Sequence, residues 1–274
     1  MEEKEQNLLG RKTDKLDSIL KELNSFVVAF SGGVDSSFLL HRAHSLNKIE
    51  IMGVTIRTPY IPKVEIERAA DFAKRYGINH KIIDFTFPEP IRKNPVDRCY
   101  ICKKTLFTDL LAFAGKNKYK YVIDGTIADD TGSFRPGLKA LQELEIRSPL
   151  LESGLTKKEI REMSQKQGLP SWDKPAMACL LTRVPYNTEI TEGVLKMVEQ
   201  AEHFMSESGY PGTRVRIHGD LARIECLPDY LEKIINHPEK ELIISSLKKI
   251  GFRYVSLDLE GYRSGSADPE IKVL

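Results

Sequence analysis

Short apolar runs alternate with amphipathic stretches along the first part of the chain. Residues 26–30 form a wholly apolar run, which is typical of a strand buried on both faces. Strands that alternate with helices in this way form a parallel sheet. We therefore expect an α/β fold of the Rossmann-like kind. Further strands are predicted at 50–56, 80–84 and 121–124, and helices at 35–46, at 62–76 and after Cys102.

The pattern changes after Pro185, where a smaller α+β module is expected. The chain is accordingly predicted to hold two domains, residues 1–185 and residues 186–274. The second domain is expected to supply substrate contacts and subunit contacts. Its predicted elements are a helix at 191–208, two short strands around 218–220, a helical stretch at 228–249 and a strand at 253–258.

The two short strands have faces of different character, because successive strand residues point to opposite sides. One face is apolar and is expected to meet a core. The other is expected to point outward, either as an ordinary solvated face or as a site for an anion. The outward residues are Arg214, Arg216, Arg223 and Glu225, and the apolar ones are Val215, Ile217, Ala222, Ile224 and Cys226.

Composition narrows the classes of protein. With 274 residues and 41% hydrophobic content, the chain can bury one sizeable core and a smaller second one. Its formal net charge of +2 provides no strong field toward nucleic acid or an anionic membrane, so we expect neither as a partner. No apolar run approaches the roughly 18 to 20 residues that span a bilayer. The protein is expected to be soluble and cytoplasmic.

A glycine-rich segment follows the first predicted strand and opens the next helix. Backbone amides, hydroxyls and the positive helix end converge there on an anion, and Asp35 suits a role in orienting an amide or Mg²⁺. The segment is not a Walker A loop, because no Gly-Lys-Ser/Thr follows. The alternative is an ordinary glycine turn before a serine-capped helix. The segment is Ser31, Gly32, Gly33, Val34, Asp35, Ser36 and Ser37.

This segment resembles the pyrophosphate loop, or PP-loop, of the N-type ATP pyrophosphatases. The resemblance implies the adenine nucleotide α-hydrolase-like fold and an enzyme that cleaves ATP between its α and β phosphates to adenylate an acceptor. In that family an Asp-rich segment after a later strand helps to hold metal and nucleotide. Here the matching residues follow Asp124 and include Gly125 and Asp129. They could instead cap a helix or close a turn.

The chain has four cysteines, too few for a disulfide framework in an intracellular protein of this size. Cys99 and Cys102 form a CxxC pair, which fits a zinc half-site, a redox dithiol, a cluster half-site or two buried thiols. Cys179 lies between Lys174 and Arg183, whose charge favours a thiolate, although a lone cysteine before two leucines also suits a core. Cys226 is interpreted as core packing.

Residues 172–186 carry the pattern Trp-Asp-Lys-Pro-Ala-x-Ala-Cys-Leu-x-x-Arg-x-Pro-Tyr, which is similar to a motif of LarE-type sulfur transferases. Shorter matches extend the resemblance over nearly the whole chain. It implies conversion of the carboxylates of pyridinium-3,5-biscarboxylic acid mononucleotide to thiocarboxylates during assembly of the nickel-pincer nucleotide cofactor. The shorter matches are at 99–103, 135–138, 149–150 and 262–266.

The resemblance also implies roles for individual residues. In single-cysteine members, the cysteine matching Cys179 surrenders its own sulfur. This chain resembles the three-cysteine members, in which Cys99, Cys102 and Cys179 would hold a [4Fe-4S] cluster with one iron free to bind sulfide. The substrate phosphate is assigned to the arginines matching Arg214 and Arg216. Glu225 is expected nearby, and Arg263 is a further candidate that could equally form a surface salt bridge.

Three other functions remain open from the residues alone. The first is a tRNA sulfurtransferase, which should carry a basic RNA-binding module. The second is an amide-forming ligase, which would use ammonia in place of thiols. The third is a nucleotide-binding protein without catalysis. We expect a small nucleotide substrate, ATP, Mg²⁺, a sulfide or other sulfur donor, and a homo-oligomer.

Overall fold

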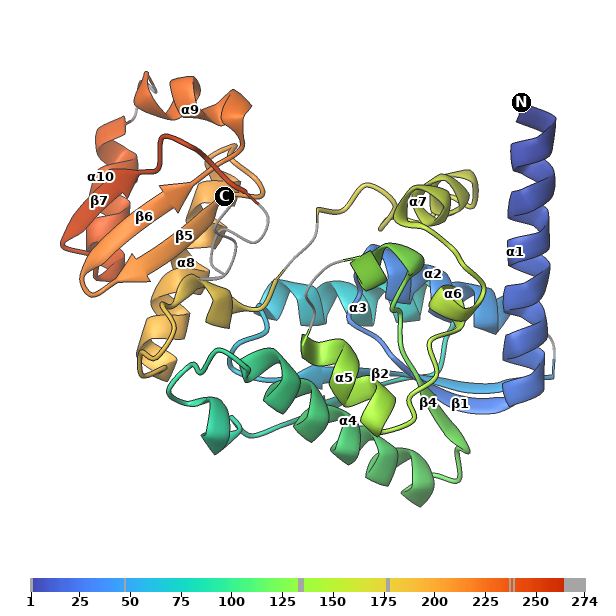
Figure 1. Ribbon diagram of the computed structural model, residues 1–274. Coiled ribbons are helices and arrows are strands. Elements are labelled where there is room, and N and C mark those ends of the chain that lie inside the picture. Colours follow the sequence, from blue (N-terminus) through green and yellow to red (C-terminus); the bar gives the residue numbers. More distant parts are fainter. Residues whose placement is uncertain are drawn as a thin grey trace. The chain divides into compact units, whose positions relative to one another are not determined.

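The computed structural model describes residues 2–263 except 47, 133–135, 176–177, 237 and 239. The chain forms two compact units (Figure 1). Unit 1 consists of Met1–Pro90 and Asp97–Met177, and unit 2 consists of Ile91–Val96 and Ala178–Leu274. The division into domains 1–185 and 186–274 stays a prediction about which parts fold independently.

Unit 1 is built on a four-stranded sheet in which every strand pair is parallel. The strand order is β3-β2-β1-β4, so the chain crosses from one side of β1 to the other after β3. This confirms the predicted α/β fold. The strands are β1 (Ser25–Ala29), β2 (Glu50–Arg57), β3 (His80–Asp84) and β4 (Tyr121–Ile123).

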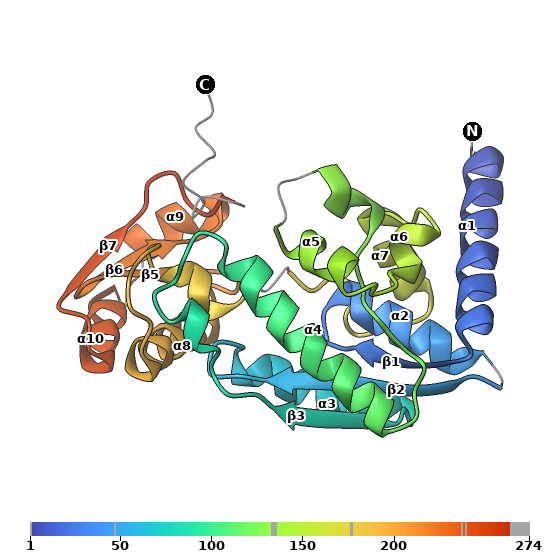
Figure 2. The same ribbon diagram turned by 60° about the horizontal axis from the view of Figure 1, so that its bottom comes forward.

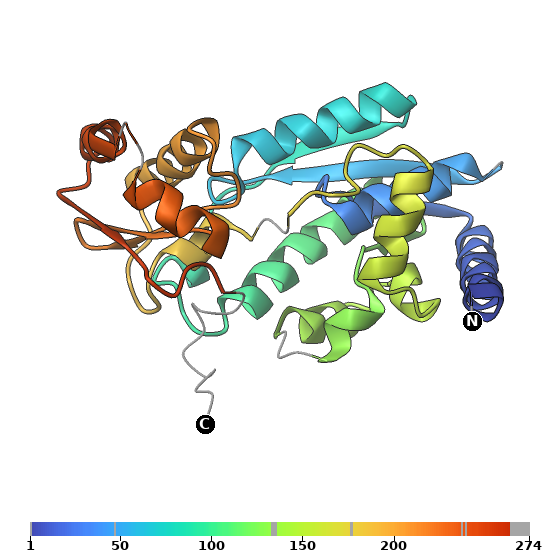
Figure 3. The ribbon, with the colours of Figure 1, turned by 90° about the horizontal axis from the view of Figure 1, so that it is seen from above.

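Helices cover both faces of this sheet because its central strand is apolar on both sides. Phe26 and Val28 of β1 pack in one core cluster with α1 and α2, whereas Val27 packs in another with α4. Figure 2 and Figure 3 show α3 on one side of the sheet and α4 on the other. The helices are α1 (Glu2–Leu23), α2 (Val34–Ser45), α3 (Lys63–Tyr76), α4 (Arg98–Lys116), α5 (Pro136–Glu143), α6 (Pro149–Glu152) and α7 (Lys157–Lys166).

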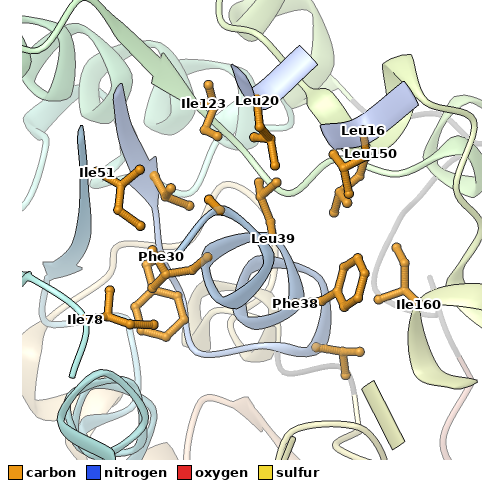
Figure 4. Close-up of a cluster of buried hydrophobic side chains, with 14 of the residues drawn as sticks. Leu16, Leu20, Phe30, Phe38, Leu39, Ile51, Ile78, Ile123, Leu150 and Ile160 are labelled. Atoms are coloured by element: carbon orange, nitrogen blue, oxygen red, sulfur yellow. The ribbon is translucent and has the colours of Figure 1, made fainter. Parts of the chain in front are cut away.

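The larger core cluster surrounds α2, the helix that opens at the glycine-rich loop. Phe38 and Leu39 of α2 are fully buried among side chains from α1, the sheet and α7 (Figure 4). Deep burial fixes the axis of α2, and the loop at its first turn is held accordingly.

One boundary differs from the prediction in a way that matters for the cysteines. The helix expected after Cys102 begins at Arg98, so both cysteines of the CxxC pair lie inside the first turns of α4. A spacing of three residues places Cys99 and Cys102 on the same side of this helix. The start was predicted too late because the preceding residues are rich in proline and charge, which is typical of a loop.

Unit 2 has a three-stranded sheet of order β5-β6-β7, in which β5 and β6 are antiparallel and β6 and β7 are parallel. The helical stretch predicted at 228–249 is two helices, because Pro238 has no amide hydrogen to continue the first. The elements are α8 (Glu192–Glu207), β5 (Arg214–His218), β6 (Leu221–Glu225), α9 (Pro228–Ile235), α10 (Lys240–Ile250) and β7 (Tyr254–Leu257).

Among the residues that the structure describes, no helix is both long enough and apolar enough to span a membrane.

Candidate active site

The glycine-rich loop connects β1 to α2 at the carboxyl end of the sheet. Gly32 has φ of 71°, and a Cβ placed there would lie 3.1 Å from Cβ of Ala69 in α3. The position therefore requires glycine for both its backbone conformation and its packing. The Oγ atoms of Ser31 and Ser36 lie 3.1 Å apart, and the Ser31 amide donates to Ser36 Oγ at 3.3 Å. These two hydroxyls close the loop on itself.

A pocket of about 320 Å³ opens beside this loop, entirely within unit 1. Part of its wall is apolar, which suits the base of a nucleotide. The other part is formed by the glycine-rich loop, with Asp35, and by two further aspartates outside the loop. Its volume is at the lower end of the range for small-molecule sites. The apolar lining includes Phe30, Val54, Ile56, Ile61 and Ile66, and the polar lining includes Ser31, Asp35, Ser36, Lys103, Asp124 and Asp130.

Asp124 and Gly125 follow β4 directly, and Gly125 packs against the start of α2. A Cβ on Gly125 would lie 3.1 Å from the Ser36 amide nitrogen, so only glycine allows β4 to come this close to the start of α2. The buried Asp124 carboxylate accepts from Ser148 Oγ at 2.6 Å and from Thr126 Oγ1 at 2.5 Å. It is thereby fixed in orientation at the pocket wall.

Lys103 brings a positive charge to the same pocket. Its Nζ lies 3.9 Å from Asp124 Oδ2. Its side chain passes over Gly137, where an added Cβ would lie 2.8 Å from Lys103 Cδ. Lys103 directly follows Cys102, so α4 supplies both a thiol and a cation from adjacent positions. Sequence reasoning missed this lysine as a site residue, although it belongs to the same short motif as the CxxC pair.

Asp35 forms an ion pair with Lys157, the first residue of α7. Lys157 Nζ lies 2.7 and 2.9 Å from the two carboxylate oxygens. Burial raises the pKa of Asp35 above its ordinary value, and the hydrogen bond from Lys157 opposes that rise. Lys157 was not predicted from the sequence, because 122 residues separate it from Asp35.

Asp129 and Asp130 both accept hydrogen bonds from backbone amides. Asp129 Oδ2 accepts from the Lys157 amide at 2.6 Å, at the first turn of α7, and Asp130 Oδ2 accepts from the Ile127 amide at 3.1 Å. These are the helix-capping and turn-closing bonds named as the alternative to metal binding. Asp130 also lines the pocket, and a role of Asp129 in binding nucleotide stays a prediction.

Cys99 and Cys102 are thiols on α4 that belong to no disulfide. Cys99 is exposed, whereas Cys102 is half-buried and lies with its Sγ 3.2 Å from the hydroxyl of Tyr60. Both cysteines lie in the first two turns of the helix. Tyr60 is another contact that the sequence did not reveal.

Cys179 belongs to unit 2, directly before the 3₁₀ helix η3 (Leu180–Arg183). Its thiol is half-buried and belongs to no disulfide. Its backbone carbonyl oxygen accepts hydrogen bonds from the side chains of Thr182 and Arg183. Arg183 is 1% exposed and binds Glu202 of α8 through both carboxylate oxygens, at 2.7 and 3.0 Å. The cysteine segment is therefore anchored inside unit 2 by a buried ion pair.

The arginine face of the β5–β6 hairpin, formed by Arg214, Arg216, Arg223 and Glu225, is largely buried. The prediction that this face points outward was wrong, because Arg214, Arg216 and Glu225 are only 4%, 6% and 1% exposed. The apolar residues do occupy the opposite, core-facing side. Alternation along a strand distinguishes its two faces but does not show what covers each of them.

Covering segments come from elsewhere in unit 2. Arg216 donates to Glu225 at 2.5 Å and to the Thr182 carbonyl oxygen at 2.6 Å. Arg214 lies 3.8 Å from Glu202 and over the ring of Tyr262, with 5.5 Å between its Cζ and the ring centroid. The structure thus brings the predicted substrate arginines and the Cys179 segment together. Arg263, by contrast, is exposed and pairs with Glu260.

Over the described ranges, no group of three or more His, Cys, Asp or Glu side chains is arranged to hold a metal ion. Five matched motif positions, Arg135, Ala176 and residues 264–266, lie outside the residues that the structure describes.

A parallel sheet with a Ser-Gly-Gly-x-Asp-Ser loop at its carboxyl end, beside a pocket with an apolar wall, defines a PP-loop ATP pyrophosphatase. In agreement, the family model of the queuosine biosynthesis protein QueC matches residues 25–101. The chain is also 35% identical, over 94% of both sequences, to the pyridinium-3,5-bisthiocarboxylic acid mononucleotide synthase of Lactiplantibacillus plantarum. It therefore belongs to the LarE-type family of ATP-dependent sulfur transferases.

Two further relatives have similar length and identity. The chain is 38% identical to an uncharacterised protein of Synechocystis, over 94% of this chain and 97% of the relative. It is also 38% identical to an uncharacterised protein of Methanocaldococcus jannaschii, over 93% of this chain and 98% of the relative.

Proposed function

We propose that this enzyme converts the two carboxylates of pyridinium-3,5-biscarboxylic acid mononucleotide to thiocarboxylates, for nickel-pincer nucleotide biosynthesis. The observation that carries the proposal is the similarity over 94% of both chains to a protein named for synthesis of the bisthiocarboxylic product. The ATP pocket of unit 1 and the cationic groups of unit 2 agree with a substrate that has both carboxylates and a phosphate.

In the first step, a substrate carboxylate oxygen attacks the α-phosphorus of ATP. The bond to the bridging oxygen breaks, and pyrophosphate leaves. The loop from Ser31 to Ser37 would hold the pyrophosphate through its amides and hydroxyls, Lys103 would offset developing charge, and Asp35 would bind Mg²⁺. Sulfur then attacks the acyl carbon, the acyl–oxygen bond to AMP breaks, and a thiocarboxylate results. Two carboxylates require two rounds.

The arginine face is the proposed site for the substrate phosphate. Burial lowers the pKa of Arg214, and the nearby Arg183 adds to that effect. A phosphate would therefore stabilise the charged guanidinium where it is least solvated. Arg216 would keep its bond to Glu225 and donate to the substrate phosphate as well. A guanidinium group can bind phosphate through two parallel hydrogen bonds.

Cys99, Cys102 and Cys179 are the proposed ligands of a [4Fe-4S] cluster. Two thiols three residues apart on the first turns of α4 suit such a pair, and all three cysteines are at least partly accessible. When bound, the cluster would supply an iron without a protein ligand for the sulfide to be transferred. Cys226 is fully buried in the core of unit 2 and is not a candidate.

The decisive experiment measures iron and acid-labile sulfide per chain in protein purified without oxygen. About four iron per chain are expected. Cys99→Ala, Cys102→Ala and Cys179→Ala should each lose the cluster absorption, whereas Cys226→Ala should keep it. Absence of iron after reconstitution, with activity lost only in Cys179→Ala, would instead indicate a cysteine that surrenders its own sulfur.

Substrate class is tested separately by supplying ATP and sulfide with the biscarboxylic mononucleotide or with tRNA, and ATP and ammonia with the mononucleotide. Thiocarboxylate formation and stoichiometric AMP are expected only with the mononucleotide and sulfide. Thiolation of tRNA alone, or amide formation that survives replacement of all three cysteines, would exclude the proposed function.

A further inference from the structure

A second pocket, of about 310 Å³, lies behind the PP-loop within unit 1. Gly32 lines it, whereas its neighbours Ser31 and Gly33 line the ATP pocket, so the loop backbone is a wall between the two. The proposed function makes no use of this second pocket. Its lining comprises Gly32, Arg68, Asp71, Phe72, Arg75, Pro170, Ser171 and Lys174.

The charged side chains of the lining are mainly basic. Four of them come from one face of α3, at positions 68, 71, 72 and 75, which recur at helical spacing. Three basic side chains, Arg68, Arg75 and Lys174, face one acidic side chain, Asp71. Glu65 lies behind them and pairs with Arg68 at 2.9 Å and with Lys174 at 3.4 Å, so the three cations exceed the carboxylates of Glu65 and Asp71 by one positive charge.

Lys174 connects the pocket to the PP-loop. Its Nζ donates to the Gly32 carbonyl oxygen at 3.0 Å and lies 3.4 Å from Glu65. Its side chain is only 17% exposed, and burial lowers its pKa while Glu65 opposes that effect. An anion beside Lys174 would stabilise its charged form and, with it, the bond that holds Gly32.

Ser171 provides an independent indication of a ligand. It is 3% exposed, and within the described part of the chain its Oγ has no hydrogen-bond partner. A buried hydroxyl without a partner is unfavourable, so native proteins rarely keep one unless water or a ligand satisfies it. Ser171 lines the pocket, and although its Oγ is closed to water in its present position, rotation about χ1 would turn the hydroxyl toward an occupant.

We propose that this pocket binds a small phosphate-bearing anion, held by Arg75, Lys174 and Ser171, and that the occupant steadies the PP-loop through the Lys174–Gly32 bond. Guanidinium and ammonium groups beside a hydroxyl are the donors that phosphate oxygens accept from. The pocket volume suits a small molecule. The phosphate could be pyrophosphate released by the reaction or free orthophosphate, and the two are distinguished by experiment.

The test titrates pyrophosphate, and separately orthophosphate, into the full chain while α,β-methylene ATP and Mg²⁺ saturate the PP-loop. An Arg214→Gln background removes the proposed substrate-phosphate site of unit 2, and calorimetry should then detect one further site per chain. Affinity should fall at least tenfold in Arg75→Gln and in Ser171→Val, and it should be unchanged in Arg11→Gln, an exposed residue of α1 outside the pocket. The tighter of the two anions identifies the source.

Absence of a second site for both anions would overturn the proposal, as would binding that the two pocket variants do not weaken. If Ser171→Val lowers the melting temperature, Ser171→Ala and Arg75→Lys provide milder tests, the second retaining partial affinity. Because the ATP analogue cannot react, this measurement is independent of sulfur transfer. Its failure would leave the proposed function intact, and loss of thiocarboxylate formation would not affect it.

Discussion

Arg216 Nη1 lies 2.6 Å from the carbonyl oxygen of Thr182, to which it donates a hydrogen bond. Thr182 is three residues after Cys179, and its own amide donates to the Cys179 carbonyl oxygen at 3.2 Å. One guanidinium therefore connects a proposed phosphate site to the segment that carries a proposed sulfur-handling thiol. A substitution at the proposed phosphate site should therefore alter the stability of the Cys179 segment, and a substitution in that segment should alter the phosphate site.

Replacement of Arg216 tests this connection. Arg216→Gln removes a charged bond worth about 1.5 kcal/mol, so the amide of Thr182 should exchange with solvent roughly tenfold faster. Hydrogen exchange followed by mass spectrometry or NMR measures the change. Arg223→Gln is the matched control, because Arg223 binds the same Glu225 but is not the donor to Thr182. Equal acceleration in both variants would contradict the connection.

Glu225 should stabilise unit 2 in a pH-dependent manner. Burial alone would raise its pKa, but Arg216 and Arg223 outweigh burial and hold the pKa below its ordinary value of 4.5. A lowered folded-state pKa adds stability that is present above pH 4.5 and is lost as the pH falls through the folded-state pKa.

Glu225→Gln should therefore lower the free energy of unfolding by about 3 kcal/mol at pH 7, because it leaves two guanidiniums without their carboxylate. The difference from the wild type should shrink below pH 4.5. Denaturant unfolding at several pH values measures it. The exposed Glu260→Gln provides the control, and a difference independent of pH would refute the assignment.

Lys157 should control the ionisation of Asp35. Removing the positive charge in Lys157→Gln leaves burial unopposed, so the pKa of Asp35 should rise further. If Mg²⁺-ATP binding needs ionised Asp35, acidification should weaken it at a higher pH in Lys157→Gln than in the wild type. Carboxyl NMR titration and binding measurements check the two effects. Lys158→Gln, which removes an exposed neighbour paired with Glu162, should leave the titration of Asp35 unchanged.

Gly32 should not tolerate a side chain. Gly32→Ala places a Cβ 3.1 Å from Ala69 and forces alanine to a φ of 71°, which costs about 1–2 kcal/mol in backbone strain. Both thermal stability and ATP affinity should fall. Gly115→Ala, in α4 with nothing within 4 Å of an added Cβ, should instead stabilise by about 0.5–1 kcal/mol. Similar behaviour of the two variants would argue against the strained loop.

The sequence by itself determined the features that depend on neighbouring residues. The apolar run ending at Phe30 and the glycines after it specify a buried strand, a tight loop and a helix start, all within about a dozen positions. Periodicity gave the α/β class and most element bounds, because burial of one face repeats at fixed intervals. Short motifs around Cys99 and Cys179 were enough to identify the family.

Only the tertiary structure decided what covers each surface and which distant charges meet. Lys157 pairs with Asp35 across 122 residues, and η3 with Tyr262 buries an arginine face that alternation alone presented as outward. It also placed Cys179 in the same unit as those arginines. The physical reason is that a strand's side-chain pattern depends on its own backbone, whereas burial and ion pairing depend on segments that folding brings from far along the chain.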